Sequence, residues 1–133
     1  MNMHTLNLWA VLAAAVAAFL LGGLWYAPFL FGKAWQRANG FSDPPPATNK
    51  AKDFTICFIL TLVMSLNLAM FLNAPTTTAF GAAAGFAAGF GWVAMGIAII
   101  SLFERRPWSY VFINGGFLTI ALTVMGAILG AWR

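Results

Sequence analysis

The chain has 133 residues, of which 62% are hydrophobic and only 8% are charged, and its mean hydropathy is +0.84. Soluble domains carry about 25% charged residues, so this composition excludes a soluble protein and indicates a membrane protein. The net charge of +4 does not indicate nucleic-acid binding, because the basic residues flank long apolar segments and can face lipid headgroups there. The predicted partners are membrane lipids, with no nucleic acid.

Four uncharged segments are long enough to cross a bilayer as helices. A hydrocarbon core of about 30 Å needs roughly 20 helical residues. The segments cover about residues 5–31, 54–73, 79–103 and 110–132. Runs such as AVLAAAVAAFLLGG are continuous and rich in Ala, Leu and Gly, which favours helices over the alternating strands of a barrel. We predict one all-α transmembrane domain over residues 1–133, an integral membrane four-helix bundle.

The breaks between the segments contain helix-ending residues. Pro28 ends the first helix and is expected to leave the carbonyl of Leu24 without an intrahelical donor. The loop at 32–53 is long enough for a short helix over GKAWQRAN, lying in the membrane interface. The segment SDPPPATN cannot continue a helix, and Asp53 is placed to cap the second span.

Charge predicts the orientation. The loops after the first and third spans hold four and two Lys or Arg residues, whereas the opposite side holds only Arg133. The positive-inside rule therefore places loops 32–53 and 104–109 in the cytoplasm and both termini outside. The expected interface anchors are Lys33, Arg37, Arg105 and Arg106 with the aromatic residues Trp35 and Trp108.

Small residues repeat every four positions in each span, which lets helix backbones approach closely in a membrane. The clearest ridge is Gly81, Gly85 and Gly89 in the third span, and Gly22 belongs to the ridge of the first. These ridges can pack helices within one subunit or between subunits. Because four short spans enclose little space, we expect a homo-oligomer of unspecified order.

The central parts of the spans carry no Asp, Glu, Lys, Arg or His, which are the usual markers of proton relays and ion-coupled transport. His4 is the only histidine and Cys57 the only cysteine, and we expect Cys57 to be a small buried side chain. We therefore predict no metal, no cofactor and no enzymatic activity.

Uncharged polar residues remain in the spans. At about 1.5 Å per residue, Asn67 and Thr123 lie at one depth in the outer half, and Asn114 and Tyr26 lie at another in the inner half. We predict these two pairs. They can hold helices together, or they can line a path or pocket for a neutral ligand, with Thr119 beside them.

The stretch LGGLWYAPFLFGKAW has two interpretations. Trp25 and Tyr26 can be belt aromatics at headgroup level. Alternatively, the adjacent glycines, the Pro28 break and Asn114 can form a small site around these two rings.

Several motifs resemble a known family. The chain contains GGLWYAPFLFGKAW, then NGF, GFGWVAMG, RPWSYVFINGGF and GAILGAW, in order over nearly its whole length. This pattern resembles the bacterial membrane proteins grouped as domain of unknown function 1761. The resemblance implies a small integral membrane protein with four spans, and it implies no activity. We expect the protein in the bacterial cytoplasmic (inner) membrane.

Three functional classes follow. A passive channel or transporter of a small ion or solute through an oligomer is the first, supported by the polar residues of the second and fourth spans. A structural or accessory protein that binds lipid or a larger membrane partner is the second. An enzyme acting on lipid is the third, and the missing acid and base argue against it.

Overall fold

The computed structural model describes residues 6–41, 49–72 and 76–132, and every regular element among them is helical. The elements are α1 (Leu8–Trp25), α2 (Gly32–Asn39), α3 (Lys50–Phe71), α4 (Thr78–Ala88), the π-helical segment η2 (Gly89–Ala94), α5 (Met95–Phe103) and α6 (Trp108–Ala131). Because α4, η2 and α5 run on as one helix, four helices are long and apolar enough to span a membrane. The predicted all-α, four-span architecture is confirmed. Arg133, His4 and most of SDPPPATN lie outside the described residues.

The first span is shorter than predicted. It ends at Trp25. The N–H of Tyr26 still bonds to the carbonyl of Gly22, four residues earlier, but the N–H of Ala27 bonds to a carbonyl only three residues earlier. The N–H of Ala27 donates to the carbonyl of Leu24 over 3.2 Å. The expectation that Pro28 leaves this carbonyl without a donor is therefore wrong, since a tighter turn satisfies it before the proline is reached.

The second span begins earlier than predicted, at Lys50. Its N-cap is Asn49, whose side-chain oxygen accepts from the backbone N–H of Lys52 over 3.1 Å. Asp53 lies in the first turn instead of at the cap. A carboxylate there still interacts favourably with the positive end of the helix dipole.

The glycine ridge of the third span packs on α6 of the same chain. A Cβ atom added to Gly81 would overlap the carbonyl of Gly126, and one added to Gly85 would overlap the carbonyl of Leu122. The two backbones are therefore in direct contact, which larger residues would prevent. Among the described elements, α4 and α6 form the most extensive helix pair.

The π-helical segment keeps this contact in register. Gly81, Gly85 and Gly89 are four residues apart, but the next buried residue of this stretch is Ala94, five residues further on. Ala94 faces Gly115, where an added Cβ would lie 3.1 Å from the Ala94 Cβ. An α-helical spacing would bring Val93 to this position, so the π-turn replaces a branched side chain by a methyl group at the interface.

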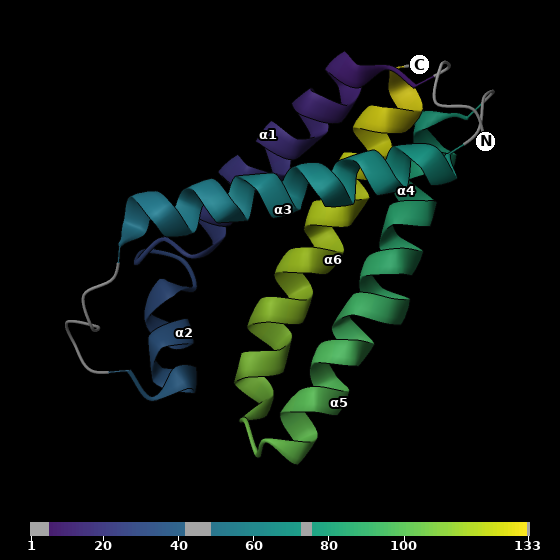
Figure 1. Ribbon diagram of the computed structural model, residues 1–133. Coiled ribbons are helices and arrows are strands. Elements are labelled where there is room, and N and C mark those ends of the chain that lie inside the picture. Colours follow the sequence, from purple (N-terminus) through teal and green to yellow (C-terminus); the bar gives the residue numbers. More distant parts are fainter. Residues whose placement is uncertain (1–5, 42–48, 73–75, 133) are drawn as a thin grey trace.

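The core lies where α1 meets α6 and α3. It contains small residues of α1, such as Ala14, and larger residues of the other two helices, such as Leu68 and Met125. Ser65, which is fully buried, donates a 2.8 Å hydrogen bond to the backbone carbonyl of Val11. Figure 1 shows α3 crossing the bundle obliquely, and it packs mainly on α1 while making few contacts with α6.

The two ends of the bundle differ in charge. Asn7 Nδ2 lies 3.4 Å from the carbonyl oxygen of Trp132, so the start of α1 and the end of α6 are at the same end of the bundle, as their ribbons in Figure 1 also show. The described charged residues lie on α2, in the first turn of α3 and in the α5–α6 turn, at the helix ends away from Asn7 and Trp132: Lys33, Arg37, Lys50, Lys52, Asp53, Glu104, Arg105 and Arg106. We call this the basic end.

Candidate functional site

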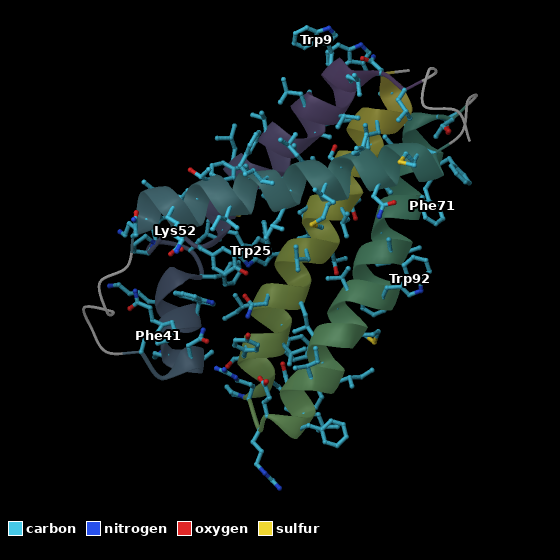
Figure 2. All side chains as sticks on the ribbon, in the orientation of Figure 1. Trp9, Trp25, Phe41, Lys52, Phe71 and Trp92 are labelled. Atoms are coloured by element: carbon cyan, nitrogen blue, oxygen red, sulfur yellow. The ribbon has the colours of Figure 1, made fainter. Side chains whose placement is uncertain are left out.

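Two consecutive aromatic residues at the end of α1 bind α6. The indole Nε1 of Trp25 donates to the backbone carbonyl of Ile113 over 3.0 Å. The hydroxyl of Tyr26 donates to Oδ1 of Asn114 over 2.6 Å. The structure thus brings together the pair Tyr26 and Asn114. Figure 2 shows Trp25 within the bundle, whereas Trp9 projects away from it.

Further aromatic rings pack around these two. The ring of Phe31 lies 4.6 Å from that of Trp25, and the ring of Tyr26 lies 5.4 Å from Phe117 and 5.9 Å from Trp35. The missing side chain of Gly22 makes room for Phe117, because an added Cβ would lie 3.1 Å from its Cζ. Such offset and edge-to-face contacts stabilise the cluster beyond the area that it buries.

The chain turns back on itself after Tyr26 and presents α2 to α6. The N–H of Phe31 donates to the carbonyl of Trp25 over 3.1 Å, and that of Gly32 donates to Ala27 over 3.0 Å. A Cβ at Gly32 would overlap the carbonyl of Tyr26, so this tight reversal needs glycine. The short helix is present as predicted, and it packs beside the first half of α6.

Arg106 connects the far end of α2 to the bundle. Its Nη1 donates to Oδ1 of Asn39 over 3.3 Å, its guanidinium lies 5.0 Å from the ring centre of Tyr110, and its Nε lies 3.5 Å from Glu104. The positive charge of this residue is therefore already engaged. It holds the α5–α6 turn to α2.

A cavity lies between α2 and α6, and we call it the polar cavity because Tyr26, Gln36 and Asn114 bring polar groups to a largely apolar lining. Its volume is about 370 Å³, and it is lined by Tyr26, Pro28, Gly32, Trp35, Gln36 and Asn114. Because Oδ1 of Asn114 accepts from Tyr26, the amide NH₂ of Asn114 is the group left to donate. The side-chain amide of Gln36 bonds to none of the other described residues. The lining contains no charged side chain.

A larger apolar groove also has Tyr26 in its lining. Its volume is about 710 Å³, and its walls are the facing sides of α1, α3 and α6, with Phe19, Leu60 and Phe117 among the lining residues. Asp53 is the charged residue in the lining. Cys57 is exposed in the wall of the groove, so the expectation that it is buried is wrong, because α3 stands away from α6 here.

The structure does not bring Asn67 and Thr123 together. Thr123 donates to the carbonyl of Thr119, and Thr119 donates to the carbonyl of Gly115, each over 2.7 Å within α6. Asn67 is exposed, because it lies two residues, about 200° around the helix, from the buried Ser65. These predicted site residues form no common path within one chain.

The predicted anchor residues divide into two groups. Lys33, Arg37, Arg105 and Trp108 are exposed at the basic end, as anchors would be. Trp35 is instead half-buried and forms a wall of the polar cavity. Sequence reasoning missed Gln36 and Phe117, although the motif NGGF places Phe117 one turn after Asn114, on the same face of α6.

These features define a class: a small helical membrane protein with four spans and an uncharged aromatic and amide site at its basic end. The chain belongs to a family described as protein of unknown function (DUF1761), whose model matches residues 9–130. The match includes every residue of the cavity and of the groove. No curated protein and no solved structure matches the chain.

Proposed function

We propose that this protein is an accessory membrane protein that binds one amphiphilic, lipid-like molecule at its basic end. The apolar tail lies in the groove between α3 and α6, and the polar end lies in the cavity between α2 and α6. The observation that carries this proposal is that Tyr26 forms a wall of both spaces, so an apolar site and a polar site meet at one residue. The role is binding, not catalysis.

The size and lining of the two spaces support this function. Volumes of about 370 and 710 Å³ are typical of small-molecule sites, in which apolar walls surround a few polar groups. Any lipid tail in the bilayer can fill the apolar groove equally well, because lipid gives no hydrophobic preference for it. Selectivity therefore depends on the polar cavity.

The hydrogen bonds within the spans favour binding over passage through one chain. The hydroxyls of Thr119 and Thr123 are both satisfied by carbonyls of their own helix, and Ser65 by Val11. The side chains between α1 and α6, such as Ala14 and Met125, are closely packed with no exposed surface. One subunit therefore offers no polar route along its helices.

A passive channel formed by several copies is the second candidate. Asn67 favours it, because this amide lies on the exposed face of α3 and bonds to none of the other described residues. Several copies arranged around an axis could bring such amides together. A homo-oligomer is part of this second proposal.

For location, we propose the bacterial cytoplasmic membrane with the basic end in the cytoplasm and both termini outside. The Lys and Arg residues at one end of the bundle support this orientation by the positive-inside rule. It would place the bound polar group at the inner leaflet. Cysteine accessibility from each side of sealed vesicles tests it.

The first experiment is native mass spectrometry of the protein extracted in a mild detergent. We expect one small molecule to remain bound per chain. Leu60→Trp fills the groove and should abolish retention, whereas Ile59→Trp, on the neighbouring exposed face of α3, should retain it. Equal retention by both variants, or no retained molecule in the natural protein, would contradict the proposal.

The second experiment measures flux of small ions and neutral solutes into liposomes that carry the protein. A binding protein gives no selective flux. Selective flux that Asn67→Leu abolishes, with unchanged retention of the bound molecule, would establish the channel instead.

A further inference from the structure

We infer that the polar end of the bound molecule is uncharged and presents carbonyl oxygens to the amides of Asn114 and Gln36; this inference rests on the proposed function. The cavity between α2 and α6 therefore selects a neutral amphiphile. Bulk phospholipids with charged headgroups are not its ligand.

The hydrogen-bond inventory of the cavity indicates an acceptor ligand. The Tyr26 hydroxyl uses its only proton to bond Oδ1 of Asn114. This bond orients the Asn114 amide, so that its two N–H donors remain for a ligand. Gln36 contributes a second amide that bonds to none of the other described residues; its NH₂ can donate to a ligand, and its Oε1 can accept from water or from a ligand hydroxyl. A ligand with carbonyl oxygens can accept from these solvent-accessible donors, whereas a purely apolar ligand would displace the water around them without offering an acceptor.

The charges around the cavity disfavour an anionic headgroup. Arg106 is engaged by Glu104, Asn39 and Tyr110, and it does not line the cavity. Lys33 and Arg37 on α2 are exposed and are also absent from the lining. An anion in the cavity would lose hydration without gaining a cationic partner, which is costly.

A cationic headgroup fits no better. Asp53 is the one carboxylate in the linings of the cavity and the groove, and it lies in the wall of the groove. Asp53 is exposed to solvent and lies in the first turn of α3 beside Lys50 and Lys52. Water and these two ammonium groups screen its attraction for a further cation.

The remaining walls fit a flat, weakly polar group. Trp35 and Tyr26 meet edge to face, and Pro28 adds a third apolar surface. The ring of a quinone and the ester groups of a diacylglycerol both combine carbonyl oxygens with a long apolar tail. This shared chemistry is the ligand class that we propose.

Cys57 provides a measurement of occupancy, because it is the only cysteine and lies in the groove wall. The assay follows the rate at which N-ethylmaleimide alkylates Cys57 in the full chain in detergent micelles. Four probes are compared: a decyl benzoquinone with a fully substituted ring, dioctanoylglycerol, dioctanoyl phosphatidylglycerol and dodecyltrimethylammonium. The control protein carries Cys57→Ser and Ile59→Cys, so that its thiol lies outside the groove.

We expect at least one of the two neutral carbonyl probes to slow alkylation of Cys57 by about tenfold at a concentration where the charged probes change it less than about twofold. Protection by the quinone alone identifies a ring, and protection by dioctanoylglycerol alone identifies an ester. Neither neutral probe should protect the control thiol. Gln36→Met and Asn114→Leu should each remove most of the protection, whereas Asn67→Leu, which deletes an amide on the exposed face of α3, should not.

The possible failures are distinct. Equal or stronger protection by phosphatidylglycerol or the ammonium probe, or full protection in both Gln36→Met and Asn114→Leu, would overturn the neutral-carbonyl inference and leave amphiphile binding in place. Absence of protection by all four probes, together with no molecule retained in native mass spectrometry, would overturn the proposed function itself.

Discussion

The hydroxyl of Tyr26 and Oδ1 of Asn114 lie 2.6 Å apart although 88 residues separate them in the chain. This hydrogen bond joins the end of α1 to the first third of α6, beside the parallel bond from Trp25 to the carbonyl of Ile113. Together these contacts fix the position of the chain reversal that presents α2. The polar cavity therefore depends on them.

Tyr26→Phe removes only the hydroxyl and should lower the free energy of unfolding by about 0.6 to 1.7 kcal/mol, the range measured for hydrogen bonds between membrane helices. It also frees Oδ1 of Asn114, so retention of the bound molecule should fall as the amide loses its orientation. Thermal unfolding in detergent and native mass spectrometry measure the two effects. Tyr110→Phe is the control, since it keeps the ring beside Arg106 and removes a hydroxyl that bonds to none of the other described residues. Indistinguishable values for the two variants would show that the bond contributes nothing.

Trp25→Ala should be far more damaging than Trp9→Ala. Trp25→Ala removes a hydrogen bond to α6 and contacts with Phe31 and Phe117, for an expected cost of about 3 kcal/mol, the lower end of the range for Trp→Ala because the ring is half-buried. Trp9 is 71% exposed, so its loss should change stability by less than about 0.5 kcal/mol. The midpoints of thermal unfolding of the two variants measure this difference. Equally small shifts would show that Trp25 is only an aromatic residue at headgroup level.

Gly85→Leu should separate α4 from α6 and unfold the subunit, because the added side chain would occupy the position of the Leu122 carbonyl. We expect a cost above about 3 kcal/mol, at the upper end of overpacking effects. Gly96→Leu is the matched control, since a Cβ there meets no atom within 4 Å. Loss of folded monomer in the first variant alone is the expected outcome. A Gly85→Leu protein that folds normally and only changes its oligomer size would place the ridge between subunits instead.

Ser65→Ala should weaken the contact between α3 and α1, because it deletes the bond to the Val11 carbonyl. The expected cost is about 0.6 kcal/mol, with an upper limit of about 1.7 kcal/mol. Thr61→Ala is the comparison, since its hydroxyl bonds only to Cys57 O within α3. Thermal unfolding in detergent measures the loss in each variant. A larger effect from Thr61→Ala would refute this assignment.

Several features of the site follow from the sequence alone. The four spans and the clustering of basic residues at one end follow from the lengths of uncharged segments and the positions of Lys and Arg. The pairing of Tyr26 with Asn114 also follows, because a constant rise of about 1.5 Å per residue converts sequence position into depth. The tightly packed glycine ridge follows from its spacing of four residues.

Only the tertiary structure decided which face each helix turns to its neighbours and where two neighbouring helices separate. Their similar depth in the membrane predicted that Asn67 pairs with Thr123, but depth does not determine which face of a helix a residue occupies. Because Ser65 faces α1, Asn67 lies on the exposed face of α3. The oblique crossing of α3, which opens the groove and exposes Cys57, depends on packing with α1. The reversal at Gly32 brings Gln36 and Asn114 to the same cavity. Local sequence patterns could not predict this proximity, because the two residues are far apart in the sequence.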